Sequence, residues 1–452
     1  MHADDKRRLV GLDHRYVWHP FTQMRDWLRE EPLFIERGDG NYLIDVDGKR
    51  YLDGVSSLWA NVHGHNRKEI NDAIKNQLDK ISHTTMLGLA NVPATLLAEK
   101  LVKISPKGLN KVFYSDNGST AVEIALKMAY QYWKLKSKPR KAKFIKLKEA
   151  YHGDTVGSVS LGGIDIFHNT FSSLLFETFN IPSPFYYHSN FTSEDECMNY
   201  SLSILRSTLD KNHNKIAGLF IEPYIQGAGG MIVYPKGFMK EVYTLCKEYE
   251  VLFIADEVAT GFGRTGVMFA CEEDRLEPDI MSIAKGISGG YLPLAATLTT
   301  DEIYNTFLGE YSEYKTFYHG HTYTGNPLAC SAAIASLDIF EDDNVLKHLQ
   351  EKIIFIKEML NSLWKLDCVG DIRQKGLMIG IELLSDKRKK EFYDPTLRVG
   401  HRVCMEARKH NLIIRPLGDV IVLMPPLSIS MEEIKMLIDV VYTSVVNVTN
   451  KL

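Results

Sequence analysis

The chain has 452 residues, of which 45% are hydrophobic and 24% charged, and this ordinary globular composition excludes a disordered chain, a collagen and a coiled-coil rod. The formal net charge of −4 gives no indication of a polyanionic partner such as nucleic acid. No apolar run approaches the ~20 residues that cross a bilayer, and the first residues lack the apolar core of a signal peptide. We therefore expect a cytoplasmic protein with no membrane partner.

One strand pattern stands out near the N-terminus. Residues 41–53, NYLIDVDGKRYLD, alternate apolar and polar side chains on both sides of a turn, which predicts a β-hairpin. We expect this segment to pack against a lobe formed by the other end of the chain.

Between about residues 110 and 300, strand-like apolar runs alternate with stretches of helical periodicity. One helix is expected to begin near Ser119 and another to span 237–248, and Ser119 and Thr120 stand where capping residues are found. The expected strands are KVFYSD, KFIKL, AGLFIEP, VLFIADE, PDIMSIAK and LPLAATLTT. Apolar strands separated by helices form a mostly parallel sheet covered on two faces, and such sheets bind ligands at the carboxyl ends of their strands.

The pattern changes after about Gly325. Helices at 327–340 and 345–363 are followed by the short strands GLMIGIEL, LIIRPLG and VIVLMPP, which indicates a smaller α+β lobe. We therefore predict an α/β protein with a large domain at residues 65–325 and a small domain built from residues 1–64 and 326–452.

Two features of the central segment suggest ligand binding. Residues 114–120, YSDNGST, end a strand and open a helix, so backbone N–H groups, a hydroxyl and the positive end of the helix dipole meet there. This is either a phosphate site or a plain helix cap. Asp256 and Glu257 close an apolar strand, where a carboxylate is costly without a cation. Asp256 therefore either holds a protonated cofactor nitrogen or belongs to a structural salt bridge.

A third feature is Lys285, which ends another apolar strand. Desolvation there lowers the pKa of the amine, which suits covalent attachment to an aldehyde, unless the side chain reaches water at the strand end. A phosphate site, a carboxylate and a lysine in one sheet match the three attachment points of pyridoxal phosphate, namely its phosphate, ring nitrogen and aldehyde carbon.

Other patterns have competing explanations. Gly261, Gly263 and Gly266 form a literal GxGxxG, the signature of a dinucleotide-dependent oxidoreductase, but no apolar helix follows, so we treat the match as accidental. Tyr151, after the KFIKL strand, either stacks on a planar cofactor or fills the core beside a turn. Two H-x-H pairs and six widely spaced cysteines lack the partners of a metal site, so we expect no metal and reduced thiols.

Six motifs, in this order along the chain, resemble those of the class III, fold-type I pyridoxal-phosphate aminotransferases: DNGSTAVEIALKMAYQYW, YHGDT, IEPYIQGAGGM, ADEVATGFGRTG, AKGISGG and HGHTYTGNPLAC. The resemblance covers nearly the whole chain, from about Trp18 to Pro426. WHPFTQM, SSLWANVHGH and RPLGDVIVLMPP are similar to the branch of this family that acts in biotin biosynthesis. That likeness implies amination of 8-amino-7-oxononanoate to 7,8-diaminononanoate, and an aminotransferase of the ornithine or 4-aminobutyrate type is the alternative.

The resemblance also implies roles for individual residues. Lys285 is expected to bind the cofactor aldehyde and to shuttle protons, Asp256 to hold the ring nitrogen, and Gly118 and Ser119 to hold the phosphate. Tyr151 is expected to lie over the cofactor and to shape the substrate site. In the family a second subunit completes each site, which implies a homodimer.

Further residues are expected to complete the site. His321 and Thr322 of the second subunit are expected to reach the phosphate, and Gly320 to contact substrate. Arg415 matches the arginine that receives the substrate carboxylate, for which a planar guanidinium offers a two-point grip that lysine cannot. A structural salt bridge is the alternative for Arg415.

Phe21 and Leu58 indicate which compound donates the amino group. Relatives that use S-adenosylmethionine typically carry Tyr and Trp at these positions. Phe21 has no hydroxyl to donate, and Leu58 lacks the large ring face that favours a sulfonium cation. The pair resembles the variant group that takes L-lysine, which makes lysine the favoured donor over S-adenosylmethionine.

Overall fold

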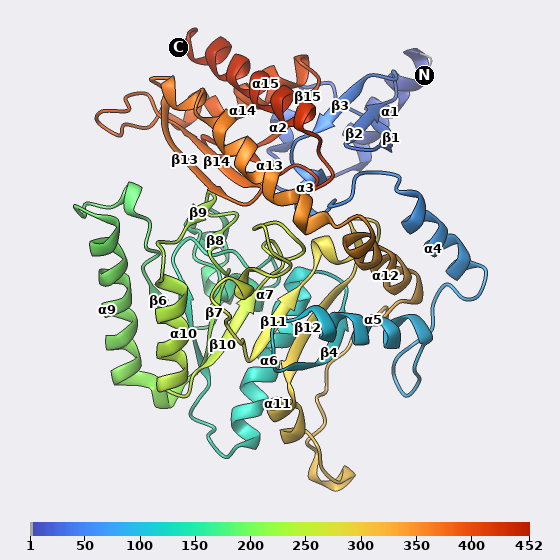
Figure 1. Ribbon diagram of the computed structural model, residues 1–452, viewed down its shortest axis with the longest axis vertical. Helices are drawn as coiled ribbons and strands as arrows, with labels where there is room; N and C mark the ends of the chain where they lie inside the picture. Colours follow the sequence, from blue (N-terminus) through green and yellow to red (C-terminus); the bar gives the residue numbers. More distant parts are fainter. Residues whose placement is uncertain (1–2) are drawn as a thin grey trace.

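A seven-stranded sheet forms the centre of the computed structural model, which describes residues 3–452 (Figure 1). Its strands, in spatial order, are β4 (Leu109–Ser115), β12 (Ala295–Thr300), β11 (Ile280–Ile283), β10 (Leu252–Asp256), β7 (Ile216–Ile221), β5 (Lys143–Leu147) and β6 (Phe179–Ile181). β12 is antiparallel to both neighbours, and the other adjacent pairs are parallel. The prediction of a mostly parallel sheet is confirmed.

Helices cover both faces of this sheet, and the alternation of side chains along β10 shows how. Leu252 and Ile254 join a buried cluster with residues of α6 (Gly118–Leu135). Phe253 and Ala255, which point to the other face, belong to the cluster that contains α10 (Phe238–Glu248). A strand that is apolar at every position is therefore buried from both sides, as the run VLFIA predicts.

Further elements lie along the chain between residues 3 and 306. The helices are α1 (Ala3–Tyr16), α2 (Met24–Trp27), α3 (Ser56–Trp59), α4 (Lys68–Leu78), α5 (Val92–Ile104), α7 (Val156–Leu161), α8 (Asp165–His168), α9 (Glu194–Asn212) and α11 (Asp301–Thr306). A small two-stranded sheet contains β8 (Ile225–Gln226) and β9 (Ile232–Val233). Within residues 3–452, none of the helices combines the length and apolarity that a membrane span requires.

The two ends of the chain meet in one sheet. Its strands, in spatial order, are β1 (Ile35–Asp39), β2 (Tyr42–Asp45), β3 (Arg50–Asp53) and β15 (Leu412–Ile413). β2 and β3 form the predicted hairpin, and β3 pairs in parallel with β15, where Leu52 lies opposite Leu412. Figure 1 accordingly shows the blue N-terminal strands beside the red C-terminal elements at one end of the molecule.

The C-terminal part adds a second four-stranded sheet and four helices. The strands, in spatial order, are β13 (Val369–Lys375), β14 (Met378–Leu383), β17 (Val420–Leu423) and β16 (Arg415–Leu417). The helices are α12 (Pro327–Asp342), α13 (Val345–Leu360), α14 (Val399–Lys409) and α15 (Met431–Thr449). The pattern predicts α12 and α13 but not α14, α15 or β13. The domain boundaries near residues 64 and 325 stay a prediction, which the pairing of β3 with β15 supports.

Candidate functional site

Five loops meet in a cavity of about 770 Å³, which we call the central cavity. They follow β4, β5, β7, β10 and β11, which run in the same direction, so that their carboxyl ends lie at one edge of the sheet. Of the residues predicted to bind cofactor or substrate, this cavity is lined by Leu58, Gly118, Ser119, Tyr151, Asp256 and Lys285. The fold thus brings six predicted residues together at the edge where a ligand is expected.

The first turn of α6 borders the central cavity. Asn117 caps this helix instead of Ser119 or Thr120: its Oδ1 accepts the Thr120 N–H at 3.0 Å, and Thr120 Oγ1 accepts the Asn117 N–H at 3.2 Å. Gly118 allows Val258 to pack closely against this turn, because a Cβ on residue 118 would lie 2.6 Å from Cγ1 of Val258. The N–H groups of Gly118 and Ser119 have no partner inside the helix, so this turn is suited to a phosphate.

Asp256, at the end of β10, is only 4% exposed and is held by two contacts. Its Oδ2 lies 2.6 Å from Nδ1 of His152, and its Oδ1 accepts the Val258 N–H at 3.0 Å. Among residues 3–452, Nε2 of His152 has no hydrogen-bond partner. His152 was missed from sequence, although it directly follows Tyr151 in the YHGDT motif. The pair fixes a carboxylate that can face a cationic ring nitrogen.

Lys285 lies two residues beyond β11, where it begins a tight turn. Its side chain lines the central cavity, and its Nζ is 4.6 Å from the ring centroid of Trp59. Burial lowers the pKa of the Lys285 amine to about 8, although the carboxylates of Asp256 and Glu222 act in the opposite direction. Lys285 therefore offers the amine of lowered pKa that its position in the sequence predicts.

Glu222, after β7, is a further buried acid of the cavity that sequence reasoning left without a role. Its carboxylate accepts the N–H groups of Tyr151 at 3.1 Å and of Gly227 at 2.9 Å. Burial raises the pKa of Glu222 to about 7. The IEP motif at the end of a strand was the available signal. Glu222 ties the backbone of Tyr151 to the neighbouring strand.

Tyr151 connects the central cavity to an aromatic cluster. Its hydroxyl donates to Oδ2 of Asp154 at 2.7 Å, and burial raises its pKa above the ordinary value. Phe167 packs edge-on between two rings, with centroids 6.3 Å from Tyr151 and 5.4 Å from Phe21. Phe167 carries no sequence motif, so only the tertiary contacts identify it.

Arg415 and Phe21 line a neighbouring cavity of about 750 Å³, which we call the outer cavity. Arg415 is half-buried, and burial lowers the pKa of its guanidinium. Within residues 3–452, no carboxylate comes within 4.0 Å of this guanidinium, whereas Arg398 in the same cavity pairs with Asp26 at 2.9 Å. The structural salt bridge considered for Arg415 is therefore absent from the described part of the chain.

Gly320, His321 and Thr322 do not line either cavity within the single chain. Gly320 and Thr322 are exposed, and Nδ1 of His321 lies 2.8 Å from Oδ2 of Asp116, which does line the central cavity. This segment is therefore close to the predicted phosphate site but does not complete it. Its role across a subunit interface stays a prediction.

The GxGxxG glycines serve packing. Gly263 has a φ of 85°, and a Cβ there would lie 2.6 Å from a side-chain atom of Leu427. The segment runs through turns after β10 and leads to a single 3₁₀ turn at Ala270–Glu272, so the helix of a dinucleotide site does not follow. In the chain from residue 3 onward, no group of three or more metal-ligating side chains is found.

The central cavity offers three kinds of group to one ligand. A helix N-terminus can bind a phosphate, the carboxylate of Asp256 can bind a cationic ring nitrogen, and the amine of Lys285 can attack an aldehyde. Tyr151 adds an aromatic ring to the same wall. This donor set fits pyridoxal phosphate.

Comparison with known proteins agrees with this geometry. The family model described as aminotransferase class III matches residues 24–445. The adenosylmethionine-8-amino-7-oxononanoate aminotransferase of Geobacter sulfurreducens is 53% identical over 447 residues, which cover 98% of this chain and 99% of the relative.

Solved structures give the same result. The crystal structure of adenosylmethionine-8-amino-7-oxononanoate aminotransferase from Methanocaldococcus jannaschii has a TM-score of 0.94 and 51% identity, covering 98% of this chain and all of that one. An omega-transaminase from Pseudomonas jessenii, in complex with PMP, also has a TM-score of 0.94 but only 30% identity, with 98% of each chain covered.

Proposed function

Because the chain belongs to the class III aminotransferase family, and is therefore a pyridoxal-phosphate-dependent aminotransferase, we propose that it aminates 8-amino-7-oxononanoate to 7,8-diaminononanoate in biotin biosynthesis. The choice of acceptor rests on the 53% identity, over nearly the full length, to a relative whose name contains 8-amino-7-oxononanoate. The omega-transaminase of similar fold is only 30% identical. The ornithine or 4-aminobutyrate type is the weaker candidate, because the relative at 53% identity is named for 8-amino-7-oxononanoate.

The proposed cofactor contacts follow from the central cavity. Gly118 and Ser119 would hold the phosphate, Asp256 the ring nitrogen and Lys285 the aldehyde carbon, while Tyr151 would lie over the ring. Bound pyridoxal phosphate supplies an aldehyde that accepts amines and a ring that accepts electrons. The contacts of Asp256 with His152 and with the Val258 N–H support its part, because they hold the carboxylate in one orientation.

Lys285 is the proposed general base and acid. With a pKa of about 8, roughly a tenth of this amine is neutral at pH 7, compared with far less than one per cent for an unperturbed lysine. Its Nζ can therefore take a proton from the carbon that bears the donor amine and return one when the acceptor ketone is aminated. The half-reactions proceed in turn, with the amino group carried by the enzyme between them.

Substrate binding is proposed for the walls of the two cavities. Arg415, free of any carboxylate among the described residues, would receive the acceptor carboxylate with its guanidinium. Phe21 and Tyr151, joined through Phe167, would border the path between the cavities. Leu58 lines the central cavity and Gly320 would be supplied by a second subunit.

L-Lysine is the favoured donor over S-adenosylmethionine, because Phe21 has no hydroxyl to donate and Leu58 has no ring face for the sulfonium cation. The test mixes holoenzyme with each amine alone and follows the cofactor absorbance, then adds 8-amino-7-oxononanoate and detects the diamine by mass spectrometry. Lysine is expected to change the absorbance faster and to give product. Faster reaction with S-adenosylmethionine would reverse the donor assignment, and no diamine with either donor would reject the acceptor.

A second copy of this chain is the proposed partner, with both copies in the cytoplasm. Several apolar side chains on the segment before and within α5 are exposed, among them Leu87 at 90%, Leu89 at 60% and Val92 at 71%. This segment lies beside the one that contains Gly320–Thr322, because His83 and Tyr323 have ring centroids 4.9 Å apart. Contiguous exposed apolar surface of this kind is typical of an interface.

Sedimentation is expected to give about twice the 51.4 kDa mass of one chain. Leu89→Asp should shift the protein toward monomer and weaken cofactor binding, because His321 and Thr322 would no longer reach a partner's phosphate site. Ile354→Asp, at an exposed apolar position on α13, is the matched control and should stay dimeric. A wild-type protein that sediments as a monomer would contradict the proposal.

A further inference from the structure

The segment that carries Leu58 and Trp59 has an unusual backbone. Ser56, Ser57, Leu58 and Trp59 have φ values of 52°, 46°, 71° and 69°, so four consecutive residues other than glycine are left-handed. Each such residue costs about 1–2 kcal/mol. Strain of this kind persists only where the surrounding structure enforces it, so residues 56–59 must be held by contacts with their neighbours.

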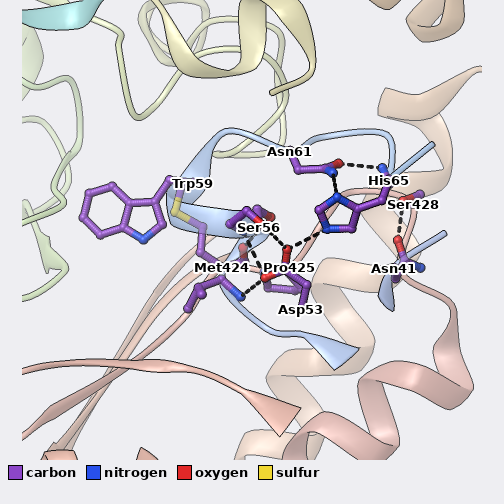
Figure 2. Close-up of polar contacts among 12 residues, drawn as sticks. Asn41, Asp53, Ser56, Trp59, Asn61, His65, Met424, Pro425 and Ser428 are labelled. Carbon is purple, nitrogen blue, oxygen red and sulfur yellow. Dashed lines mark hydrogen bonds and ion pairs between the residues drawn. The ribbon is translucent and has the colours of Figure 1, made fainter. Parts of the chain in front are cut away.

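Asp53, at the end of β3, is fully buried and binds this turn directly. Its Oδ1 accepts the N–H groups of Ser57 at 3.0 Å and Val55 at 3.3 Å. Its Oδ2 accepts the hydroxyl of Ser57 at 2.8 Å and lies 2.9 Å from Nε2 of His65 (Figure 2). One carboxylate therefore holds the turn at its first residues.

Asp53, His65 and Asn61 form a chain of hydrogen bonds (Figure 2). Nδ2 of Asn61 donates to Nδ1 of His65 at 2.9 Å, which leaves the proton on Nε2 to be donated to Asp53. Oδ1 of Asn61 in turn accepts the Gly64 N–H at 2.7 Å. These hydrogen bonds hold residues 61–65, which follow the turn, in a fixed conformation. They also fix the orientation of the imidazole.

A second anchor joins the turn to the C-terminal part of the chain. The hydroxyl of Ser56 donates to the carbonyl oxygen of Met424 at 2.7 Å, and the Met424 N–H donates to the carbonyl oxygen of Gly54 at 2.8 Å. The turn is therefore held from both β3 and the residue that follows β17.

The turn contributes one wall of the central cavity. Leu58 lines that cavity, and Trp59 lines it with its ring 4.6 Å from Nζ of Lys285. A right-handed or extended backbone at residues 56–59 would point both side chains elsewhere. The position of Leu58 and Trp59 in this wall thus depends on a strained conformation that Asp53 stabilises.

We propose that Asp53, His65 and Asn61 are positioning residues that hold the left-handed turn. They thereby place Trp59 against the amine of Lys285, and place Leu58 in the wall of the central cavity. The inference uses the proposed function only for the choice of substrate. A purely structural role would change stability alone.

The first test is Asp53→Asn, compared with Asp45→Asn. Asp45 is also buried in this sheet and accepts the Asp47 and Lys49 N–H groups and the Tyr51 hydroxyl, but it does not touch the turn. Well below the unfolding temperature, Asp53→Asn holoenzyme should show a KM for the acceptor raised about 10- to 100-fold, the range expected for a misplaced wall. Asp45→Asn should lose stability with an unchanged KM.

The second readout needs no substrate. Acrylamide quenching of tryptophan fluorescence is measured in the apoenzyme with Trp59 and with Trp59→Phe. The difference gives the quenching of Trp59 alone, a side chain that is 6% exposed. Asp53→Asn should make this component more accessible, and His65→Gln should do so less strongly. Adding Ser57→Gly to Asp53→Asn should restore part of the lost kcat/KM, because glycine adopts a positive φ without strain.

The outcomes separate the two proposals. Unchanged quenching and KM in Asp53→Asn and His65→Gln, together with lowered stability, would overturn the positioning role. Changed quenching in an enzyme that does not accept 8-amino-7-oxononanoate would leave the positioning role standing and reject only the proposed acceptor.

Discussion

Replacing Lys285 with alanine is expected to abolish measurable transamination while leaving the protein folded. Among residues 3–452, no other lysine lines the central cavity, so no second amine can bind the cofactor aldehyde and move protons. Single-turnover assays with donor and acceptor measure the loss. Lys141→Met is the matched control, since burial also lowers the pKa of Lys141 to about 8, but this lysine packs on Trp133 away from the cavity. Turnover in Lys285→Ala well above background would reject the assignment.

The same residue predicts a pH-dependent change in stability. Lys285 has a lower pKa in the folded apoenzyme, about 8, than the 10.5 of the unfolded chain. At this residue the unfolded chain therefore binds more protons between these values, so the contribution of Lys285 to wild-type stability should rise from pH 8 to 10.5. Lys285→Met should be more stable at pH 7 by about 3 kcal/mol, and urea titrations should show this advantage shrink across the window.

The central sheet could be predicted because its signal is local. In VLFIADE the residues before the carboxylates are apolar at every position, and a strand buried on both faces needs no other information. The helix α15 had an equally local signal, since Ser430 and Glu433 form a capping box that the pattern of apolar residues alone does not reveal. The helix α14 has no such signal, because it begins after Arg398 with a φ of 48° and no side-chain cap.

The contacts that organise the site could not be predicted because they join distant residues. His152 meets Asp256 across 104 positions, and Ser56 meets Met424 across 368. The turn at residues 56–59 contains no glycine, so nothing in its letters predicts four positive φ values. Sequence motifs identified the amine and the carboxylate that we propose to meet the ligand, while the residues that orient them depend on the tertiary structure.

Replacing Arg415 with alanine is expected to raise the KM for 8-amino-7-oxononanoate far more than that for the donor. The acceptor carries a carboxylate at the end opposite its ketone, and the half-buried guanidinium lines the outer cavity without a carboxylate within 4.0 Å among residues 3–452. Loss of a charge-assisted contact worth about 3 kcal/mol corresponds to roughly a 100-fold weaker interaction. The donor KM of wild type and of Arg415→Ala is measured in the first half-reaction, and the acceptor KM of both in the second.

Two variants sharpen this test. Arg415→Lys keeps the charge but not the two-point geometry, so it should recover only part of the acceptor affinity. Arg398→Ala removes a guanidinium from the same cavity that is already paired with Asp26 at 2.9 Å, and it should change the acceptor KM little. Equal losses for donor and acceptor in Arg415→Ala would mean that Arg415 maintains the shape of the cavity and does not bind the acceptor carboxylate.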